Sequence, residues 1–351
     1  MLIASVILLS LIGSLSIYSS SLREGDFSIF KKQVVFLTIG IVLMFVLSFL
    51  DWKGIRENPY FILTFYFLCV LALAGLFFFA PQTRGIKGWY KLGSFSFDPI
   101  GLTRIVLIIL LAKYFSARHI EMYKVRHIIL SGFYVFLPAV LIFFQPDLGS
   151  SLILIVLWIS ILIVSGIKLR HFLVLLLCGV LIVILSWSFL LKDYQKERII
   201  SFAMPQIEPL GMNWSQNQAK IAIGSGGVFG QGFGKGSQTQ YGFLSEPHTD
   251  FIFAAVAEEF GLVGVIIILC LFLVLVWRIV KVAILARSNF PRLFSLGLAV
   301  IIVFQAFIHI GMNIGILPVI GLSFPLVSYG GSELIAFYIG LGILQSIKNY
   351  D

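Results

Sequence analysis

Residues 246–277 read EPHTDFIFAAVAEEFGLVGVIIILCLFLVLVW, and this stretch decides the class of fold. The part after Asp250 is apolar except for Glu258 and Glu259, and it is longer than the roughly 20 residues that a helix needs to cross a bilayer. Glu246 and His248 stand just before Asp250. A carboxylate at bilayer depth is unfavourable by about 2.5–3.5 kcal/mol on insertion scales, so an acid kept there marks a candidate functional site. The stretch therefore predicts a membrane helix that begins beside a chemically important acid.

Apolar runs of this kind dominate the whole chain. Hydrophobic residues make up 59% of the 351 residues and charged residues 12%, a composition that no ordinary soluble domain has. We therefore predict an all-α polytopic membrane protein with about ten transmembrane helices. The candidate spans lie approximately at residues 1–18, 33–50, 59–80, 100–116, 128–144, 150–167, 171–191, 251–277, 293–313 and 333–347.

A long polar segment at about 192–249 separates the seventh and eighth predicted helices. Positive charges are more frequent in the short connections on the N-terminal side of the membrane, which predicts cytoplasmic termini and an extracellular 192–249 loop. We treat residues 1–351 as a single membrane domain. The net charge of +9 does not indicate a nucleic-acid partner, because the chain has no basic segment interleaved with aromatic residues.

The long loop contains a glycine-rich segment at 224–236 and shares its predicted face with the 314–332 connection. Irregular backbone at membrane depth is tolerated where protein buries it or where it lines a wet cavity, so we expect both loops to border one outer cavity. The glycines do not form a phosphate-binding loop, because Phe229 and Gly236 occupy positions where that motif needs Gly and Ser or Thr. Two alternatives stay open. The segment is a flexible turn, or its backbone amides and Lys235 approach an anionic head group.

Another polar group lies in the predicted outer loop 81–99. Lys87, Trp89 and Lys91 place cations beside an aromatic ring, an arrangement that can bind a pyrophosphate or stack on a sugar. The alternative is an interfacial tryptophan flanked by lysines whose charges reach the water layer.

The remaining polar residues also allow structural roles. Asp147 either caps the helix that follows it or presents a carboxylate to the cavity. Asp250 has the alternative of an acid at the positive end of a helix. Gln305 and His309, one turn apart in an apolar segment, are expected to form interhelical hydrogen bonds.

Taken together, four segments resemble the SEDS family (shape, elongation, division and sporulation) of membrane glycosyltransferases. They are QPDLG at 145–149, IAIGSGG at 221–227, EPHTDFIF at 246–253 and PLVSYGGS at 325–332. The resemblance covers essentially the whole chain. It implies a multi-pass protein of the bacterial cytoplasmic membrane that polymerises lipid II into peptidoglycan glycan strands on the outer face.

The resemblance also implies particular residues and a partner. The essential acid of the family's His-Thr-Asp motif corresponds to Asp250, and its outer-loop tryptophan corresponds to Trp89. The partner is a class B penicillin-binding protein, a single-pass transpeptidase that crosslinks the new strands. The short N-terminus and Ala257 favour the RodA branch, which supports cell elongation and rod shape.

Several positions depart from the family pattern. The chain has Asp98 and Gly101 where the family usually has Gln and Glu, with Arg104 following, so an acid–base pair near the fourth helix is lost or rearranged. Gly88 replaces a usual arginine and His309 a usual asparagine, which puts any role transferred to these sites in doubt.

These observations lead us to expect a metal-assisted, inverting glycosyl transfer in which Asp250 is the general base. The leaving pyrophosphate needs positive charge, and the candidates are Lys87, Lys91, Lys220 and Lys235. Glu246, His248 and Trp89 are further substrate-binding candidates. A divalent cation, Mg²⁺ or Mn²⁺, is expected, with Asp147 and Glu246 as candidate ligands. Two rival functions remain, a lipid II flippase and a non-catalytic scaffold of the elongation or division machinery.

Overall fold

The computed structural model describes residues 1–23, 25–57, 59–81, 88–93, 95–117, 125–189, 191, 193–204 and 213–350. Within these residues every predicted span coincides with a long helix. The helices are α1 (Leu2–Ser21), α2 (Ser28–Phe49), α4 (Pro59–Phe79), α5 (Ile100–Ser116), α6 (Val125–Phe144), α7 (Leu148–Val164), α8 (Leu169–Phe189), α12 (Ile252–Leu285), α13 (Asn289–Ile314) and α14 (Gly331–Tyr350).

Length and composition alone make seven of these helices in the described chain able to cross a membrane. The other three are α5 and α7, which have 17 residues each, and α14, which carries an acid in its first turn and a base in its last. Seventeen residues lie at the short end of the range for a spanning helix. The prediction of an all-α polytopic membrane protein with about ten spans is confirmed.

Short elements occupy the connections. They are α3 (Trp52–Glu57), α9 (Asp193–Ala203), α10 (Asn213–Ser225), α11 (Ser237–Gln240), β1 (Tyr90–Leu92) and β2 (Phe95–Phe97). The two strands pair antiparallel, with Tyr90 opposite Phe97. This hairpin is an addition to the predicted helical fold, and it lies inside the predicted outer loop 81–99.

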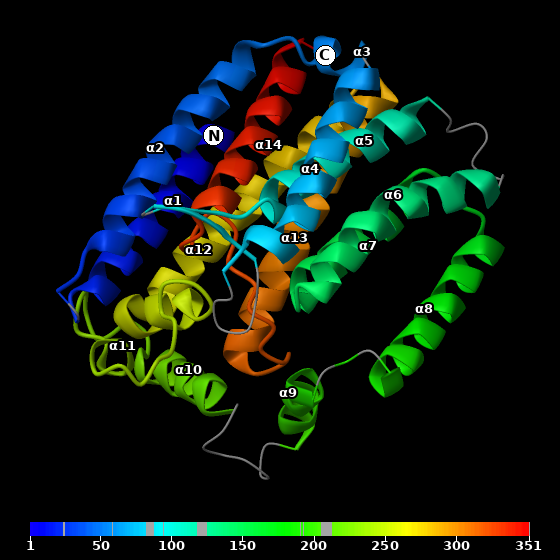
Figure 1. The fold of residues 1–351 in the computed structure, drawn as a ribbon. Helices are drawn as coiled ribbons and strands as arrows, with labels where there is room; N and C mark the ends of the chain where they lie inside the picture. The colour runs from blue at the N-terminus through cyan, green and yellow to red at the C-terminus, as the bar shows by residue number, and fades with distance from the viewer. Residues whose placement is uncertain are drawn as a thin grey trace.

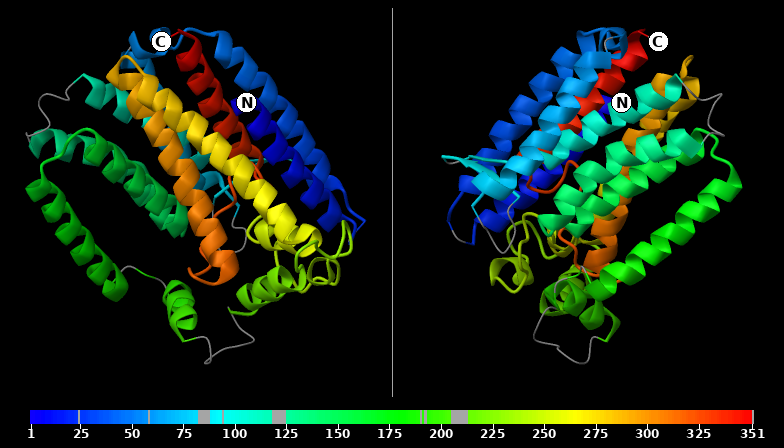
Figure 2. Two further views of the ribbon diagram at one scale, coloured as in Figure 1. Left: turned by 180° about the vertical axis from the view of Figure 1, so that it is seen from behind. Right: turned by 45° about the vertical axis from the view of Figure 1, so that its right-hand side comes forward.

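The helices form a bundle around α13, which contacts α5, α7, α12 and α14 (Figure 1). α2 packs along α14, and α1 packs along α12. In contrast, α8 lies at the edge, apart from the bundle in both views of Figure 2, and none of its residues is buried. Its apolar surface therefore faces outward along its whole length, as expected of a helix surrounded by lipid.

The two ends of the bundle differ. The C-terminus and α3 lie at one end, while α9, α10 and α11 gather at the other (Figures 1 and 2). Arg278, near the C-terminal end of α12, contacts Met1, so the N-terminus lies toward the end opposite α10 and α11. For clarity we call the end that carries α10 and α11 the polar end.

The glycine-rich segment is packed against a break in α12. Gly261 has φ 65° and ψ −161°, which interrupts the helix. Any residue with a side chain would be strained at this position, because L-residues favour negative φ. Leu262 N–H then donates to Gly227 O (2.9 Å) and Val263 N–H to Val228 O (3.1 Å). Gly226 and Gly230 therefore pack closely against the backbone of α12, and the approach of Lys235 to an anionic head group stays a prediction.

Candidate functional site

The acid-bearing turn at 246–250 is held by its own backbone carbonyls. Tyr329 N–H donates to His248 O (2.8 Å), and Ser328 Oγ donates to Thr249 O (2.8 Å). Asn313 Nδ2 donates to Asp250 O (3.0 Å). Three successive carbonyls are thus fixed by α13 and by the α13–α14 connection. The two polar loops therefore contact each other, and the outer cavity that we expect them to border stays a prediction.

The Asp250 side chain lies beside the α13–α14 connection. A Cβ built on Gly321 would lie 3.7 Å from Asp250 Oδ2, and Gly321 itself is exposed with φ +71°. α12 begins at Ile252 with Phe251 as its N-cap, so Asp250 lies one residue outside the helix. Asp250 as a whole residue is partly buried.

Two further candidates, Glu246 and His248, share this turn. Both are partly buried. Glu246 has φ +46°, a conformation that L-residues rarely adopt and that functional turns often hold. Its carbonyl accepts from Thr249 N–H (3.2 Å) and Phe251 N–H (3.3 Å). The geometry therefore groups Glu246, His248 and Asp250 in one tight turn.

The candidate cations come from different elements of the structure. Lys220 is exposed on α10, and its aliphatic stem covers Gly315 at the left-handed end of α13. Its charge therefore lies near the negative end of α13, next to the connection that borders Asp250. Lys235 is exposed in the glycine-rich segment. Lys87 lies outside the described residues.

The hairpin carries the outer-loop candidates. Trp89 is 36% exposed just before β1, and Lys91 is exposed within it. Tyr90 Oη donates to Ala72 O of α4 (2.6 Å), and Asp98 N–H, after β2, donates to Ser332 Oγ (2.9 Å). The hairpin is therefore tied to the start of α14, at the other end of the connection that contacts Asp250.

Asp147 takes the structural role that was one of its two alternatives. It is the N-cap of α7, and its Oδ1 accepts from Ser150 N–H (2.9 Å). Among the residues that the structure describes, no group of three or more His, Cys, Asp or Glu side chains could hold a metal ion. We therefore assign no step of the reaction to a metal held by Asp147 and Glu246.

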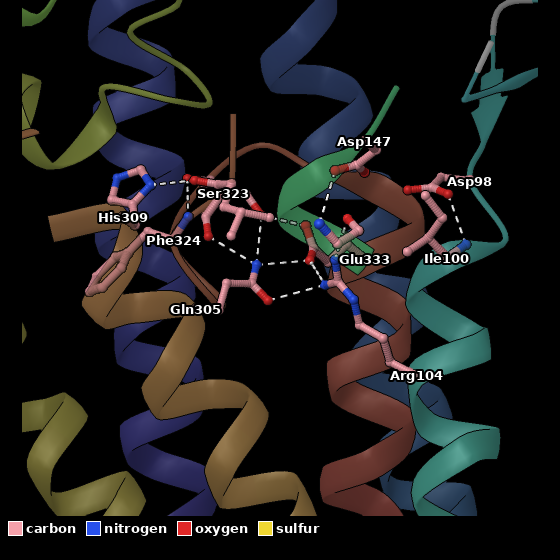
Figure 3. Close-up of polar contacts among 12 residues, drawn as sticks. Asp98, Ile100, Arg104, Asp147, Gln305, His309, Ser323, Phe324 and Glu333 are labelled. Carbon is pink, nitrogen blue, oxygen red and sulfur yellow. Dashed lines mark hydrogen bonds and ion pairs between the residues drawn. The ribbon is translucent and has the colours of Figure 1, made fainter. Parts of the chain in front are cut away.

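A buried ion pair lies beside Asp147 (Figure 3). Arg104 of α5, 4% exposed, pairs with Glu333 of α14. The same guanidinium donates to Gln305 Oε1 of α13 (3.1 Å) and to Ser150 Oγ of α7 (2.8 Å). Four helices, α5, α7, α13 and α14, are thus joined through one arginine.

This pair explains two of the altered positions. A Cβ on Gly101 would lie 3.1 Å from both Glu333 Cα and Ala336 Cβ, so glycine lets α14 approach α5 closely. The acid–base pair that the sequence left as lost or rearranged is rearranged, because Glu333 supplies the acid from α14. The signal was present in the sequence, since Glu333 is the one acid in the apolar stretch 331–347.

Burial changes the proton affinity of the two neighbouring acids. Burial raises the pKa of Asp98 to about 7. The hydrogen bond from Ile100 N–H opposes this shift, and the negative charge of Glu333 adds to it. Burial also raises the pKa of Asp147, although hydrogen bonds from Ser150 oppose the shift. Both acids lie outside the membrane-spanning helices, and burial favours the protonated form of each.

Gln305 forms the interhelical bonds that were predicted, whereas His309 bonds to the α13–α14 connection and not to another helix. Gln305 Nε2 donates to Ser323 O (2.9 Å) and to Glu333 Oε1 (2.8 Å). His309 Nδ1 lies 2.7 Å from Leu322 O, which makes Nδ1 the protonated nitrogen. Both side chains fasten the 322–324 segment to α13.

Ten long, largely apolar helices and a fixed carboxylate turn at one end define a multi-pass membrane protein with a polar site at that end. A family model described as cell cycle protein, which groups FtsW, RodA and SpoVE, matches residues 1–351. The chain belongs to this family.

Individual proteins agree with this assignment. Peptidoglycan glycosyltransferase MrdB of Escherichia coli K12 is 35% identical over 355 residues, which cover 98% of this chain and 92% of that protein. A chain of a peptidoglycan synthase complex, solved in work on the coordination of polymerization and crosslinking, matches with a TM-score of 0.81 and 30% identity over 99% of this chain and 97% of that one. The rod shape determining protein RodA of Thermus thermophilus matches with a TM-score of 0.73 and 28% identity over 99% and 96%.

Proposed function

We propose that this chain, a peptidoglycan glycosyltransferase by its family, polymerises lipid II into β-1,4 glycan strands with Asp250 as the general base. The observation that carries the assignment is the fixation of the 248–250 carbonyls, which holds partly buried Asp250 with its carboxylate beside exposed Gly321. A base must be positioned within hydrogen-bond reach of the proton it removes, and a rigid turn supplies that.

The chemistry is a single displacement. Asp250 takes the proton of the acceptor sugar's 4-hydroxyl, that oxygen forms the bond to the anomeric carbon of the donor, and the bond to the lipid pyrophosphate breaks. General base catalysis of this kind is worth about 10²–10⁴-fold in rate. Lys220 is the best placed of the described candidate cations to face the leaving pyrophosphate, because it covers the end of α13 that leads into the connection beside Asp250.

The setting follows from the same reasoning. The polar end faces the outside of the bacterial cytoplasmic membrane, both termini are cytoplasmic, and membrane lipids surround the bundle. A class B penicillin-binding protein is the proposed partner, supported by the match to a chain of a peptidoglycan synthase complex. Matches to MrdB and to a rod shape determining protein favour a role in elongation.

The test is glycan polymer formation from purified lipid II by the full chain with its transpeptidase partner. Asp250→Asn should abolish polymer, while Asp26→Asn, an exposed acid that bonds Ser28, should leave it unchanged. Unaltered polymer yield from folded Asp250→Asn would refute the base assignment. If the folded wild-type complex makes no polymer but transports lipid II, a flippase is favoured. If it makes no polymer and only binds lipid II and assembles with its partner, a scaffold is favoured. A chelator arm tests the expected Mg²⁺ or Mn²⁺.

A further inference from the structure

Asn313 is a fully buried amide near the C-terminal end of α13, and every hydrogen-bonding group of its side chain has a partner. Nδ2 donates to Asp250 O (3.0 Å) and to His309 O (2.8 Å), and Oδ1 accepts from Ala254 N–H (3.2 Å). An amide side chain offers two N–H donors and one carbonyl oxygen. The three bonds therefore need an amide, in the orientation shown, at this position.

The bond to Ala254 completes the start of α12. The first N–H groups of a helix have no partner within the helix, and a polar side chain at the N-cap normally accepts from one of them. The N-cap of α12 is Phe251, which has no side-chain acceptor. Asn313 supplies the missing acceptor from another helix, so one side chain sets both the first turn of α12 and the carbonyl of Asp250.

We propose that Asn313 is a positioning residue for the Asp250 carboxylate. The direction in which a side chain leaves the backbone depends on the two peptide planes that flank its Cα. Ser328 Oγ fixes the plane before Asp250 through Thr249 O, and Asn313 fixes the plane after it through Asp250 O. The inference rests on the proposed role of Asp250 as the base.

A second hydrogen bond also restrains the peptide plane after Asp250. Phe251 N–H, in the same plane, donates to Glu246 O at 3.3 Å, at the long end of the range for such bonds. Loss of the Asn313 bond therefore loosens the carboxylate without releasing the turn. A displacement of about 1 Å at a reacting group lowers turnover by about 10²-fold, and we expect a fall of roughly 10–100-fold.

Two variants separate the bonds of Asn313. Asn313→Asp has the same shape and keeps an acceptor for Ala254 N–H, but it loses the amide donors to Asp250 O and His309 O. Asn313→Ala loses all three bonds. With lipid II as substrate and the transpeptidase partner present, kcat should fall about 10–100-fold in both variants while KM stays within about twofold. Thermal unfolding in detergent should show Asn313→Asp closer to wild type than Asn313→Ala.

The control is Tyr338→Phe, which removes another buried bond, from Tyr338 Oη to Ser10 Oγ (3.0 Å), between α14 and α1. It should lower stability and leave kcat unchanged. Wild-type kcat in Asn313→Asp, a rise in KM at constant kcat, or an equal fall of kcat in Tyr338→Phe would each overturn the inference. If Asn313→Ala does not fold, Asn313→Asp decides alone.

Asp250→Asn, run in the same assay, keeps the two proposals apart. If Asp250→Asn retains turnover, the base assignment fails, and the role of Asn313 fails with it. If Asp250→Asn is inactive and Asn313→Asp is fully active, only the inference on Asn313 fails.

Discussion

The ion pair between Arg104 and Glu333 should show strong energetic coupling in a double-mutant cycle. Arg104 is 4% exposed, and the Glu333 side chain is 21% exposed. We expect Glu333→Met and Arg104→Met each to destabilise the fold, and the double variant to be more stable than the sum of the two predicts. The physical reason is that each single change leaves a buried charge without its main partner.

The magnitude follows from the contacts. Breaking a buried pair by removing one partner typically destabilises by 3–5 kcal/mol. Asp98 and Asp147 also lie close enough to Arg104 for its charge to lower their pKa values, so part of the attraction survives in Glu333→Met and we expect about 2–4 kcal/mol. The double variant also loses four hydrogen bonds, those of Glu333 with Gln305 and Ser323 and those of Arg104 with Gln305 and Ser150. At about 0.6 kcal/mol each in membrane proteins, this should destabilise it by about 2–3 kcal/mol.

The assay is equilibrium unfolding of the four proteins in mixed micelles, with increasing denaturing detergent. A coupling free energy of at least about 2 kcal/mol is expected, and it should change little with salt, because buried pairs are screened much less than exposed ones. Additive destabilisation, with coupling below about 0.5 kcal/mol, would refute the reasoning. It would mean that water or lipid head groups reach the pair and screen it.

Two further predictions concern the polar end. The folded state binds the Asp98 proton more tightly than the unfolded state does, because burial raises the pKa of Asp98 from 3.8 to about 7. The free energy of unfolding should therefore decline by a few kcal/mol at most as pH rises from about 4 to about 7. Asp98→Asn should flatten this pH profile when it is measured by thermal unfolding. Gly230→Ala should destabilise the fold by several kcal/mol, because φ is +80° and the new Cβ would overlap Glu259 O. Gly227→Ala, with φ +52° and open space around the Cβ, should destabilise it by only about 1–2 kcal/mol. Equal losses of stability in the two variants, measured by unfolding, would contradict the packing argument.

The helices were predictable because a membrane span needs only a long apolar run, which is a local property of the sequence. The same locality limits what could be inferred at the polar end. The partner of Arg104 depends on α5 lying against α14, and the close approach at Gly101 that permits it is visible only once the helices are packed. Glu333 stood out as a lone acid, but its partner could not be assigned.

The candidate site was recovered in part. Asp250, Glu246 and His248 were expected together because they are adjacent in sequence, and they form one turn. Asn313 was missed, because an amide in an apolar helix has many structural uses. Two of its three bonds reach Ala254 and Asp250, which lie 59 and 63 positions away in the sequence. The packing of the 224–236 segment on α12 was not predicted, because backbone pairing with a broken helix has no periodic signature in the sequence.

The break at Gly261 also determines which part of the chain can be exchanged between relatives. Gln231 and Gly232 N–H donate to the Glu258 and Glu259 carbonyls, in addition to the two bonds that run from the other side of the break. A chimera that replaced only 192–249 would set a foreign loop against four native backbone positions of α12. The smallest transplantable unit therefore extends through the first dozen residues of that helix, and loop grafts that stop at Asp250 would join two halves evolved for different partners.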